Sequence, residues 1–239
     1  MNAEPIPTPN PFDRAENAKT PAHQSVYQAL RAMILFGDLA PGQAVTIQGL
    51  VAELNAGMTP VREAIRRLIA EGALTHKGNR RVSVPVLTPQ GVDELGFMRL
   101  ALEPELTRRA LGAMTQDRLT QLRAVDDDLN AAISRGDVGG YLTHNYRFHA
   151  MIYETANAPI MAATVDRLWL RFGPSLRVVC GRFGTSNLPD KHADLLAALM
   201  AGDVDAAAQA MAEDVEQGTL QVRAALTEAA DSADSIDFP

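Results

Sequence analysis

The feature that most constrains the fold is a long stretch in which apolar residues keep helical spacing, from Thr88 to about Ala229. Residues that recur every three or four positions share one face of a helix, and that face is buried against other helices. No alternating pattern typical of strands interrupts this stretch. The sequence therefore predicts that residues 87–229 form an all-α bundle.

Capping residues and prolines divide this stretch into separate helices. Side chains suited to N-caps precede the apolar runs at Thr88, Thr115, Asp137 and Asp203. Glycines that are expected to end helices stand at Gly112, Gly136 and Gly202. Pro104 falls inside the first helix and is expected to bend it. Further boundaries are expected at Pro159, Pro174 and Pro189.

The segment before the bundle has a different pattern, in which three short helices precede a hairpin. Apolar spacing predicts the first helix over 25–36. Thr46 is expected to cap a second helix, and Thr59, followed by a proline, is expected to open a third. Alternating residues on either side of the polar tip 77–81 predict two strands. The predicted fold is mainly α: an N-terminal winged helix-turn-helix (three helices plus a small β-hairpin) over 24–86, followed by the all-α bundle.

The third predicted helix has one apolar face and one basic face. Its apolar residues are Val61, Ile65, Leu68 and Ile69, and its basic residues are Arg62, Arg66 and Arg67. The second helix of a helix-turn-helix enters the major groove by its N-terminal part, so Thr59 and Arg62 are expected to reach base edges. Phosphate contacts are expected from Arg66, Arg67, Lys77 and Arg80. The alternative is a solvated face with ordinary surface arginines.

Charge is distributed unevenly along the chain, whose net charge is −7. Residues 24–86 contain seven Lys and Arg against four Asp and Glu, a net charge of +3. Residues 1–23 carry a net charge of −1, so residues 87–239 carry −9. A basic N-terminal module beside an acidic remainder indicates that the module faces nucleic acid and the bundle does not.

The two ends of the chain and its single cysteine bear on location. Residues 1–23 are rich in proline and polar residues and lack the regions of a secretory signal, so a disordered arm is expected there. Residues 230–239 are expected to form a disordered tail. No run approaches the ~20 apolar residues of a membrane span, so no membrane contact is expected. Cys180 has no partner for an internal disulfide, which favours a cytoplasmic location.

These residues resemble the GntR family of bacterial transcription regulators, in its FadR-like branch with an FCD ligand-binding domain. The resemblance covers about residues 24–228. Its N-terminal part rests on Ala29-Leu30-Arg31, Ile34-Leu35-Phe36-Gly37, Ala40-Pro41-Gly42, Leu50-Val51-Ala52-Glu53-Leu54 and Thr59-Pro60-Val61-Arg62-Glu63-Ala64-Ile65. It implies a homodimer whose two winged domains bind an inverted-repeat operator, and an effector that alters their relative placement.

The DNA-reading segment departs from the family pattern at two places. The family usually has Ser or Thr and then Arg just before Thr-Pro, where this chain has Gly57 and Met58, so a base-reading arginine is missing. At the tip of the wing, Arg80-Arg81 replaces the Arg-Gly of many relatives and adds a cation near the DNA. The expected DNA-contacting residues are Gln48, Gly57, Met58, Thr59, Arg62, Arg66, Lys77, Asn79, Arg80 and Arg81.

The resemblance also implies a metal site in the bundle. Many FCD domains bind a divalent metal through an Asp, a His four residues later and two further His. The matching positions here are Asn145, His149, His192 and Asp214, the last aligned through the run 206–211. Two imidazoles, one amide and one carboxylate suit Zn, Ni or Mn without choosing among them, and the lack of thiolates disfavours a closed structural zinc site. The alternative is ordinary core or surface histidines with an asparagine that stabilises the bundle.

The effector is expected to be a small organic acid bound by Arg99 together with Glu103, because a guanidinium holds a carboxylate in bidentate fashion. A surface arginine is the alternative. Weaker candidates are Arg171 and Arg177, and His144 is expected on the surface, since it points about 100° away from its neighbour Asn145.

The sequence thus predicts a DNA-binding transcription regulator, not an enzyme, that acts as a repressor and is relieved by the acid. The second hypothesis is a metal-dependent hydrolase that uses the same bundle site. No HExxH, GxSxG, GxGxxG or phosphate-loop sequence supports it. A helical scaffold that binds a partner protein is a third hypothesis. Neither alternative explains the winged module.

Overall fold

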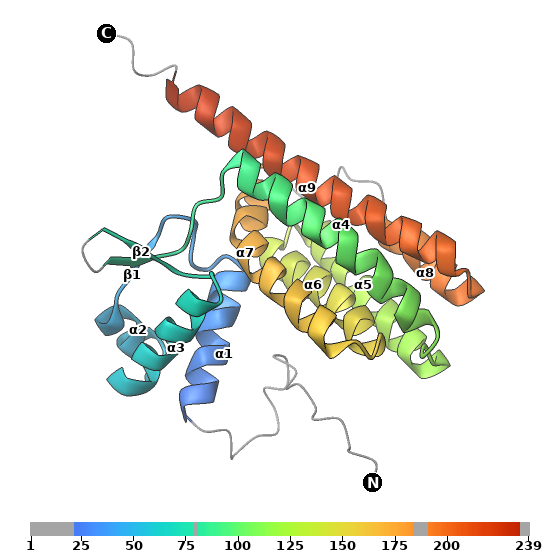
Figure 1. The fold of residues 1–239 in the computed structure, drawn as a ribbon, viewed down its shortest axis with the longest axis horizontal. Coiled ribbons are helices and arrows are strands. Elements are labelled where there is room, and N and C mark those ends of the chain that lie inside the picture. The colour runs from blue at the N-terminus through green and yellow to red at the C-terminus, as the bar shows by residue number, and fades with distance from the viewer. Residues whose placement is uncertain (1–21, 79–80, 184–190, 235–239) are drawn as a thin grey trace.

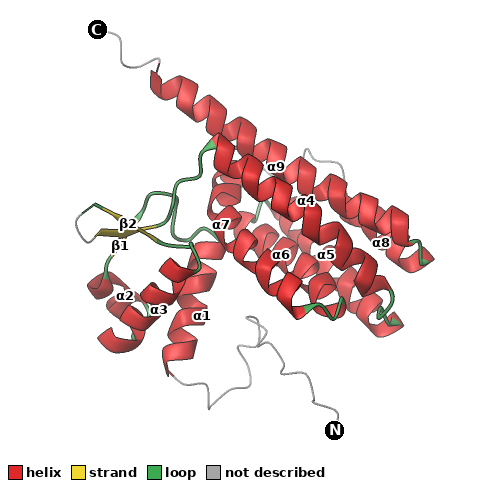
Figure 2. Cartoon of the chain, in the orientation of Figure 1, coloured by secondary structure: helices red, strands yellow, loops and turns green. Residues whose placement is uncertain are grey.

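The computed structural model describes residues 22–78, 81–183 and 191–234, and it has two parts (Figure 1). A small winged module at one end joins a larger helical bundle. Strands are confined to the winged module among the described residues, and the rest is helix and short loops (Figure 2). The fold is therefore mainly α, as the sequence predicts.

The winged module contains the three predicted helices and the predicted hairpin. Its elements are α1 (Ala22–Leu35), β1 (Ala44–Val45), α2 (Ile47–Glu53), α3 (Met58–Ala70), β2 (Thr75–Lys77) and β3 (Arg81–Ser83). The sheet order is β1-β3-β2, and both pairings are antiparallel. Strand β1 was not predicted, because a strand of two residues is too short to show alternation. It forms where Ala44 lies opposite Ser83 and Val45 opposite Val82.

Helix α3 begins two residues earlier than predicted, and Thr59 is not its cap. Gly57 occupies the N-cap position without a side-chain hydrogen bond, and its carbonyl accepts from the amide of Val61 at 3.3 Å. Pro60 therefore lies in the first turn, where a helix needs no amide donor. Thr46 caps α2 as predicted, because its hydroxyl accepts from the amide of Gly49 at 3.0 Å.

The core of the winged module forms between α1 and α3. Four side chains in this interface have no exposed surface: Leu30, Ile34, Val61 and Leu68. They recur at the helical spacing seen in the sequence, so burial of this seam holds the reading helix α3 against α1. A displacement of α1 is thus expected to carry α3 with it.

The bundle contains α4 (Pro89–Leu111), α5 (Gln116–Arg135), α6 (Val138–Thr155), α7 (Pro159–Phe183), α8 (Lys191–Ala201) and α9 (Val204–Asp234). All four predicted caps accept a hydrogen bond from an amide three residues later, at 2.8–3.1 Å: Thr88, Thr115, Asp137 and Asp203. Helices α4 and α9 pack side by side in opposite directions (Figure 1), since Asp93 pairs with Arg223 and Arg108 with Asp205.

Pro174 does not mark a helix boundary, which corrects the sequence-based expectation. It lies inside α7, just as Pro104 lies inside α4, because a long helix tolerates the loss of one backbone hydrogen bond. Pro189 and the predicted arm, apart from its last two residues, lie outside the described residues. Helix α9 continues to Asp234, into the segment expected as a tail. None of the helices described is long and apolar enough to cross a membrane.

Candidate functional site

Three of the four predicted metal ligands meet inside the bundle. His149 comes from α6, His192 from α8 and Asp214 from α9. The Nε2 atom of His149 lies 3.1 Å from one carboxylate oxygen of Asp214, and the Nε2 atom of His192 lies 3.8 Å from the other. The two Nε2 atoms are 3.4 Å apart. All three side chains therefore turn their electron-pair donors toward one point.

Hydrogen bonds on the far side of each imidazole determine where its proton lies. The Nδ1 atom of His192 is 3.2 Å from a carboxylate oxygen of Asp126, which only accepts, so Nδ1 carries the proton. Tyr153 donates its hydroxyl proton to Glu103 at 2.6 Å, so its oxygen accepts from Nδ1 of His149 at 3.1 Å. In the neutral imidazoles, both Nε2 atoms then carry a lone pair.

Two lone pairs and a carboxylate that face one another require a cation between them. With both imidazoles protonated, burial raises the pKa of Asp214, but the hydrogen bond from His149 and the charges of His149, His192 and Arg99 outweigh burial and lower this pKa to about 2. Asp214 is therefore an anion at neutral pH. Either a proton on an imidazole or a metal ion satisfies the three donors, and the donor set of two nitrogens and one oxygen fits a divalent transition metal.

The residues that orient the imidazoles were not predicted. Asp126 holds His192 and itself accepts from Asn130 at 3.2 Å, while Tyr153 holds His149. The ring of Phe148 stacks on His192 with centroids 4.0 Å apart. Such outer partners fix the tautomer and ring orientation of metal-binding histidines. A signal for Asp126 exists in the sequence, because it falls on the apolar stripe of α5.

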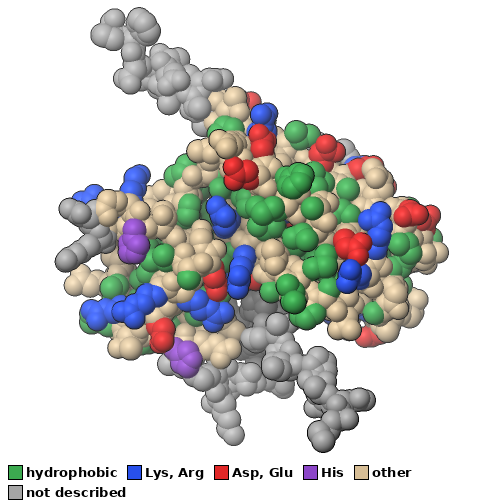
Figure 3. Space-filling model, in the orientation of Figure 1, with side chains coloured by type: hydrophobic (Ala, Val, Ile, Leu, Met, Phe, Trp, Pro, Cys, Tyr) green, Lys and Arg blue, Asp and Glu red, His purple; other side chains and the backbone are tan. Residues whose placement is uncertain are grey.

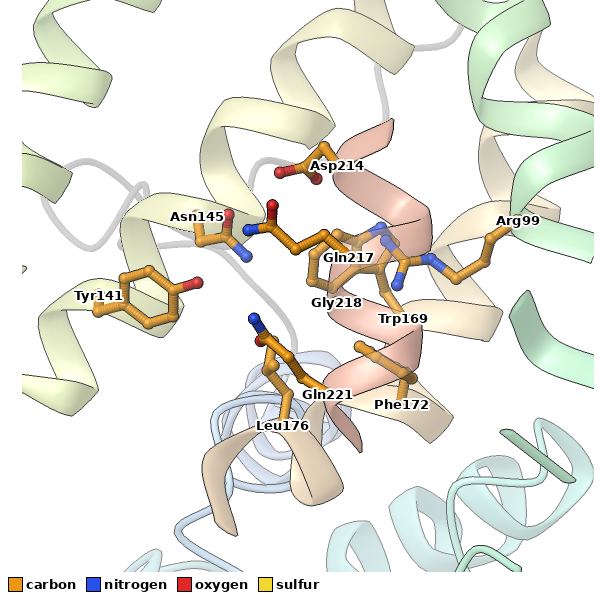
Figure 4. Close-up of a pocket in the computed structure, with 10 residues that line it drawn as sticks. All are labelled: Arg99, Tyr141, Asn145, Trp169, Phe172, Leu176, Asp214, Gln217, Gly218 and Gln221. Carbon is orange, nitrogen blue, oxygen red and sulfur yellow. The ribbon is translucent and has the colours of Figure 1, made fainter. Parts of the chain in front are cut away.

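A cavity adjoins this cluster, and Asp214 and the fourth predicted ligand, Asn145, both line it (Figure 4). Figure 4 shows the polar ends of Tyr141, Asn145 and Gln217 turned toward one another. The other lining residues are Arg99, Trp169, Phe172, Leu176, Gly218 and Gln221. The sequence reasoning found Arg99, Asn145 and Asp214 but missed Tyr141, Gln217 and Gln221, which are partly buried polar residues without a distinctive spacing.

Arg99, at the wall of the cavity, forms a buried ion pair with Glu103. The Nε and Nη2 atoms of Arg99 lie 2.5 and 3.3 Å from the two oxygens of Glu103. The guanidinium carbon stands 4.3 Å from the ring centroid of Trp169 and 4.8 Å from that of Phe172. Arg99 lines the cavity, whereas Glu103 lies behind it with no exposed surface. The structure thus places Glu103 as the partner of Arg99 and not at the cavity wall.

Three further residues considered from the sequence lie away from the cavity lining. His144 is partly buried, not on the surface, because α6 packs against α4, α5 and α7. Its Nδ1 atom has no hydrogen-bond partner within the described residues. Arg171 contacts Gly72, and Arg177 contacts Gly37, so both side chains reach the winged module.

The predicted DNA-contacting residues that the structure describes are all exposed on the winged module. Gln48 lies on α2, Gly57 precedes α3, Met58, Thr59, Arg62 and Arg66 lie on α3, and Lys77 and Arg81 lie on the wing. Lys and Arg side chains gather over this module in Figure 3. Asn79 and Arg80 lie outside the described residues.

Arg67, expected to contact phosphate, is held within the winged module. Its guanidinium carbon stands 3.7 Å from the ring centroid of Tyr27, and its Nε lies 3.0 Å from Glu71. Tyr27 donates its hydroxyl to Glu71 at 2.8 Å. Burial and this hydrogen bond raise the pKa of Tyr27 to about 12, so it stays a neutral donor. Arg67 therefore braces α3 against α1.

Comparison with known proteins identifies the class to which this fold and site belong. Residues 22–84 match the family described as "Bacterial regulatory proteins, gntR family", and residues 94–217 match the FCD domain. The chain belongs to the GntR family of bacterial regulators and carries an FCD domain. It is a DNA-binding transcription regulator, which confirms the class predicted from the sequence.

Individual relatives agree with this assignment. The HTH-type transcriptional regulator McbR of Escherichia coli K12 is 29% identical over 191 residues, which span 79% of this chain and 86% of McbR. The HTH-type transcriptional repressor RspR of the same organism is 26% identical over 211 residues, which span 87% of this chain and 91% of RspR. The solved structure of E. coli McbR/YncC has a TM-score of 0.80 at 28% identity and covers 85% of this chain and 97% of that one.

Proposed function

We propose that this regulator is a homodimeric repressor whose bundle holds a divalent metal and a small organic acid, and whose operator affinity depends on that ligand. Residues 24–86 bind the operator and residues 87–229 bind the ligand. The observation that carries the proposal is the convergence of the His149, His192 and Asp214 donors beside a cavity with polar walls. The name of RspR as a repressor supports the sign of regulation.

His149, His192 and Asp214 would hold the metal, and Asn145, which lines the cavity together with Asp214, would be the fourth ligand. Zn, Ni and Mn all suit this mixed set of nitrogen and oxygen donors. A bound metal would supply a Lewis-acidic centre with open positions for oxygen atoms of an effector carboxylate.

The charges around the cavity explain why an acid would need the metal. Arg99 is already neutralised by Glu103, and Asp214 contributes a further negative charge. The protein side chains alone therefore offer no excess positive charge to a carboxylate. The amides of Asn145 and Gln217 and the hydroxyl of Tyr141 would donate to the remaining oxygens of the acid.

Operator binding with and without ligand tests this proposal. Fluorescence anisotropy with DNA from upstream of the protein's own gene is measured for metal-free protein, protein with Zn²⁺, and protein with Zn²⁺ and candidate acids. A change in operator affinity with an acid only when Zn²⁺ is present is expected, because a ligand shifts an equilibrium only through differential affinity. Identical operator affinity under all conditions overturns ligand sensing, while leaving the DNA-binding class intact.

Replacing Arg62 by alanine is expected to weaken specific operator binding by roughly 5- to 150-fold, since a bidentate arginine–guanine contact is worth about 1–3 kcal/mol. Arg66→Ala is expected to weaken binding to all sequences alike and to lower the salt dependence by about one phosphate contact. Arg109→Ala, on the exposed surface of α4, serves as the control. Anisotropy titrations against operator and scrambled DNA separate these effects. Equal loss of affinity for both DNAs in Arg62→Ala contradicts base reading.

We assign the dimer interface to the outer face of α4 and α9. Phe97 is 75% exposed and Leu220 57% exposed, and Leu100 extends the same apolar surface. The ion pair Asp93–Arg223 joins the two helices one turn away. Hydrophobic side chains gather over this part of the bundle in Figure 3. An apolar patch with charged residues of both signs at its edge is typical of a protein interface. In a two-fold dimer the same patch of a second copy faces it, so each positive charge at the edge can meet a negative charge of the partner.

The Phe97→Asp variant is expected to raise the dimer dissociation constant by at least about 30-fold, the effect of losing an aromatic hot spot of about 2 kcal/mol. Sedimentation velocity over a concentration series measures it. Ile160→Asp is the matched control, because Ile160 is 84% exposed but lies at the start of α7. A Phe97→Asp variant that stays as dimeric as the wild type contradicts this interface.

A further inference from the structure

Helix α7 belongs to both parts of the molecule at once. Trp169 and Phe172 line the cavity, and both rings lie against Arg99. Asp166 and Gly173 of the same helix contact α1 of the winged module. The residues that line the cavity and those that contact α1 are therefore only one to three positions apart on the same helix.

A buried polar cluster joins α1 to α6 and α7. Arg31 of α1 forms an ion pair with Asp166 of α7 and donates to the hydroxyl oxygen of Tyr146 of α6 at 3.4 Å. Tyr146 donates its own hydroxyl to Asp166. Arg31 and Tyr146 are both buried, so the charge of Arg31 is satisfied by groups of the bundle and not by bulk water.

Close packing beside this cluster leaves α1 little freedom to slide. A methyl group added at Gly173 would lie 2.1 Å from the carbonyl oxygen of Leu35, so only glycine lets the end of α1 approach α7. The ring of Phe36 meets Tyr146 edge-on with centroids 6.0 Å apart. The end of α1 is thus fixed by one polar cluster and one tight steric contact.

The same cluster touches the ligand site through two neighbours. Tyr146 follows the cavity residue Asn145 and precedes His149 by three positions on α6. Its ring also meets Trp169 edge-on at 5.8 Å. The cavity is small, about 30 Å³, enough for about two water molecules, so a bound organic acid is expected to displace lining side chains.

We propose that Arg31, Tyr146 and Asp166 form a latch through which occupancy of the bundle site sets the position of α1. Ligation of His149 or a shift of Trp169 displaces Tyr146, and the latch transmits this displacement to Arg31. Because α1 packs on α3, the reading helix moves with it. This inference rests on the proposed ligand site, and it names the residues that couple that site to DNA binding.

Hydrogen exchange on the full-length protein tests the latch with Zn²⁺ alone as the probe. In the wild type, Zn²⁺ is expected to slow amide exchange over residues 30–36 at least about threefold, as expected when binding alters a local opening equilibrium. In the Asp166→Asn variant, the Zn²⁺ affinity measured by calorimetry is expected to stay within about twofold of that of the wild type. Zn²⁺ is expected to leave amide exchange in α1 of this variant unchanged. Asp166 is 38% exposed, and asparagine keeps an oxygen that can accept from Arg31, so the variant removes the counter-ion of Arg31 without adding bulk; the melting temperature checks that it is folded.

Two further variants make the result decisive. Tyr146→Phe keeps the ring contacts and removes the hydroxyl, so it is expected to reduce the α1 response as well. Glu154→Gln breaks the Arg118–Glu154 pair, which also joins two helices but lies wholly within the bundle, so it is expected to respond like wild type.

Three results overturn the latch. If Zn²⁺ slows amide exchange in α1 of the Asp166→Asn variant as much as in the wild type, the metal site and α1 are coupled through residues other than Asp166. Zn²⁺ binding in wild type without any α1 response shows that the site and α1 are not coupled. If calorimetry detects no Zn²⁺ binding to the wild type, the proposed metal site itself is overturned, and the coupling with it. This result distinguishes failure of the metal site from failure of the latch.

Discussion

Replacing Glu103 by alanine is expected to lower the free energy of unfolding by about 3–5 kcal/mol, because it leaves the guanidinium of Arg99 buried without its counter-ion. Arg99 and Glu103 are among the most buried charged residues of the described chain. The aromatic faces of Trp169 and Phe172 offer the cation only part of the lost stabilisation. Tyr153 also loses its acceptor, since its hydroxyl donates to Glu103. Urea unfolding followed by circular dichroism measures the loss.

The same helix supplies a matched control. Glu105 pairs with Arg109 at 2.8 Å with the same four-residue spacing, but both side chains are exposed. Glu105→Ala is therefore expected to cost less than about 1 kcal/mol. The double variant Arg99→Met with Glu103→Leu removes both buried charges and is expected to recover most of the stability lost in Glu103→Ala. Equal destabilisation by Glu103→Ala and Glu105→Ala would show that burial does not set the strength of the Arg99–Glu103 pair.

Local chemistry explains which parts of the fold could be predicted from sequence. Thr88 and Asp137 predict helix starts because their side chains accept hydrogen bonds from backbone amides only three residues away. Strand β1 could not be predicted, since it exists only because Val45 lies opposite Val82, far along the chain. The continuation of α7 through Pro174 could not be predicted either, because a proline alone does not distinguish the end of a helix from a position inside a long one.

The candidate site also has one part that could be predicted from the sequence and one part that could not. His149 and His192 were found through resemblance to a family, and the structure places their Nε2 atoms 3.4 Å apart. Asp126 was missed because it stands in the acidic run Asp126-Asp127-Asp128. Its place on the apolar stripe of α5 marks it as facing inward, but only the packing of α5 on α8 brings it to His192. Tyr153 was missed because it orients His149 only when its hydroxyl donates to Glu103, and that contact exists only where α6 packs against α4. Outer partners of a site depend on tertiary contacts that helical spacing alone does not reveal.

Replacing His192 by alanine is expected to weaken Zn²⁺ binding by more than about 100-fold, because loss of a ligand exceeds the 10- to 100-fold cost of losing an outer partner. Isothermal calorimetry of the metal-stripped protein measures the affinity, and the melting temperature checks that the variant is folded. Zn²⁺ is also expected to raise the melting temperature of the wild type and to leave that of His192→Ala unchanged, since only a ligand of the native state stabilises it.

Asp126 provides the sharper test, because it touches the proposed metal only through His192. Asp126→Asn replaces the acceptor at Nδ1 with an amide that can also donate, so the imidazole loses its fixed tautomer, and Zn²⁺ affinity is expected to fall about 10- to 100-fold. Asp127→Asn changes the next residue of α5, which is exposed, and is expected to leave the affinity within about twofold. A loss of affinity in both variants would indicate a general effect of negative charge, whereas a loss confined to Asp126→Asn ties the metal to the Nε2 atom of His192.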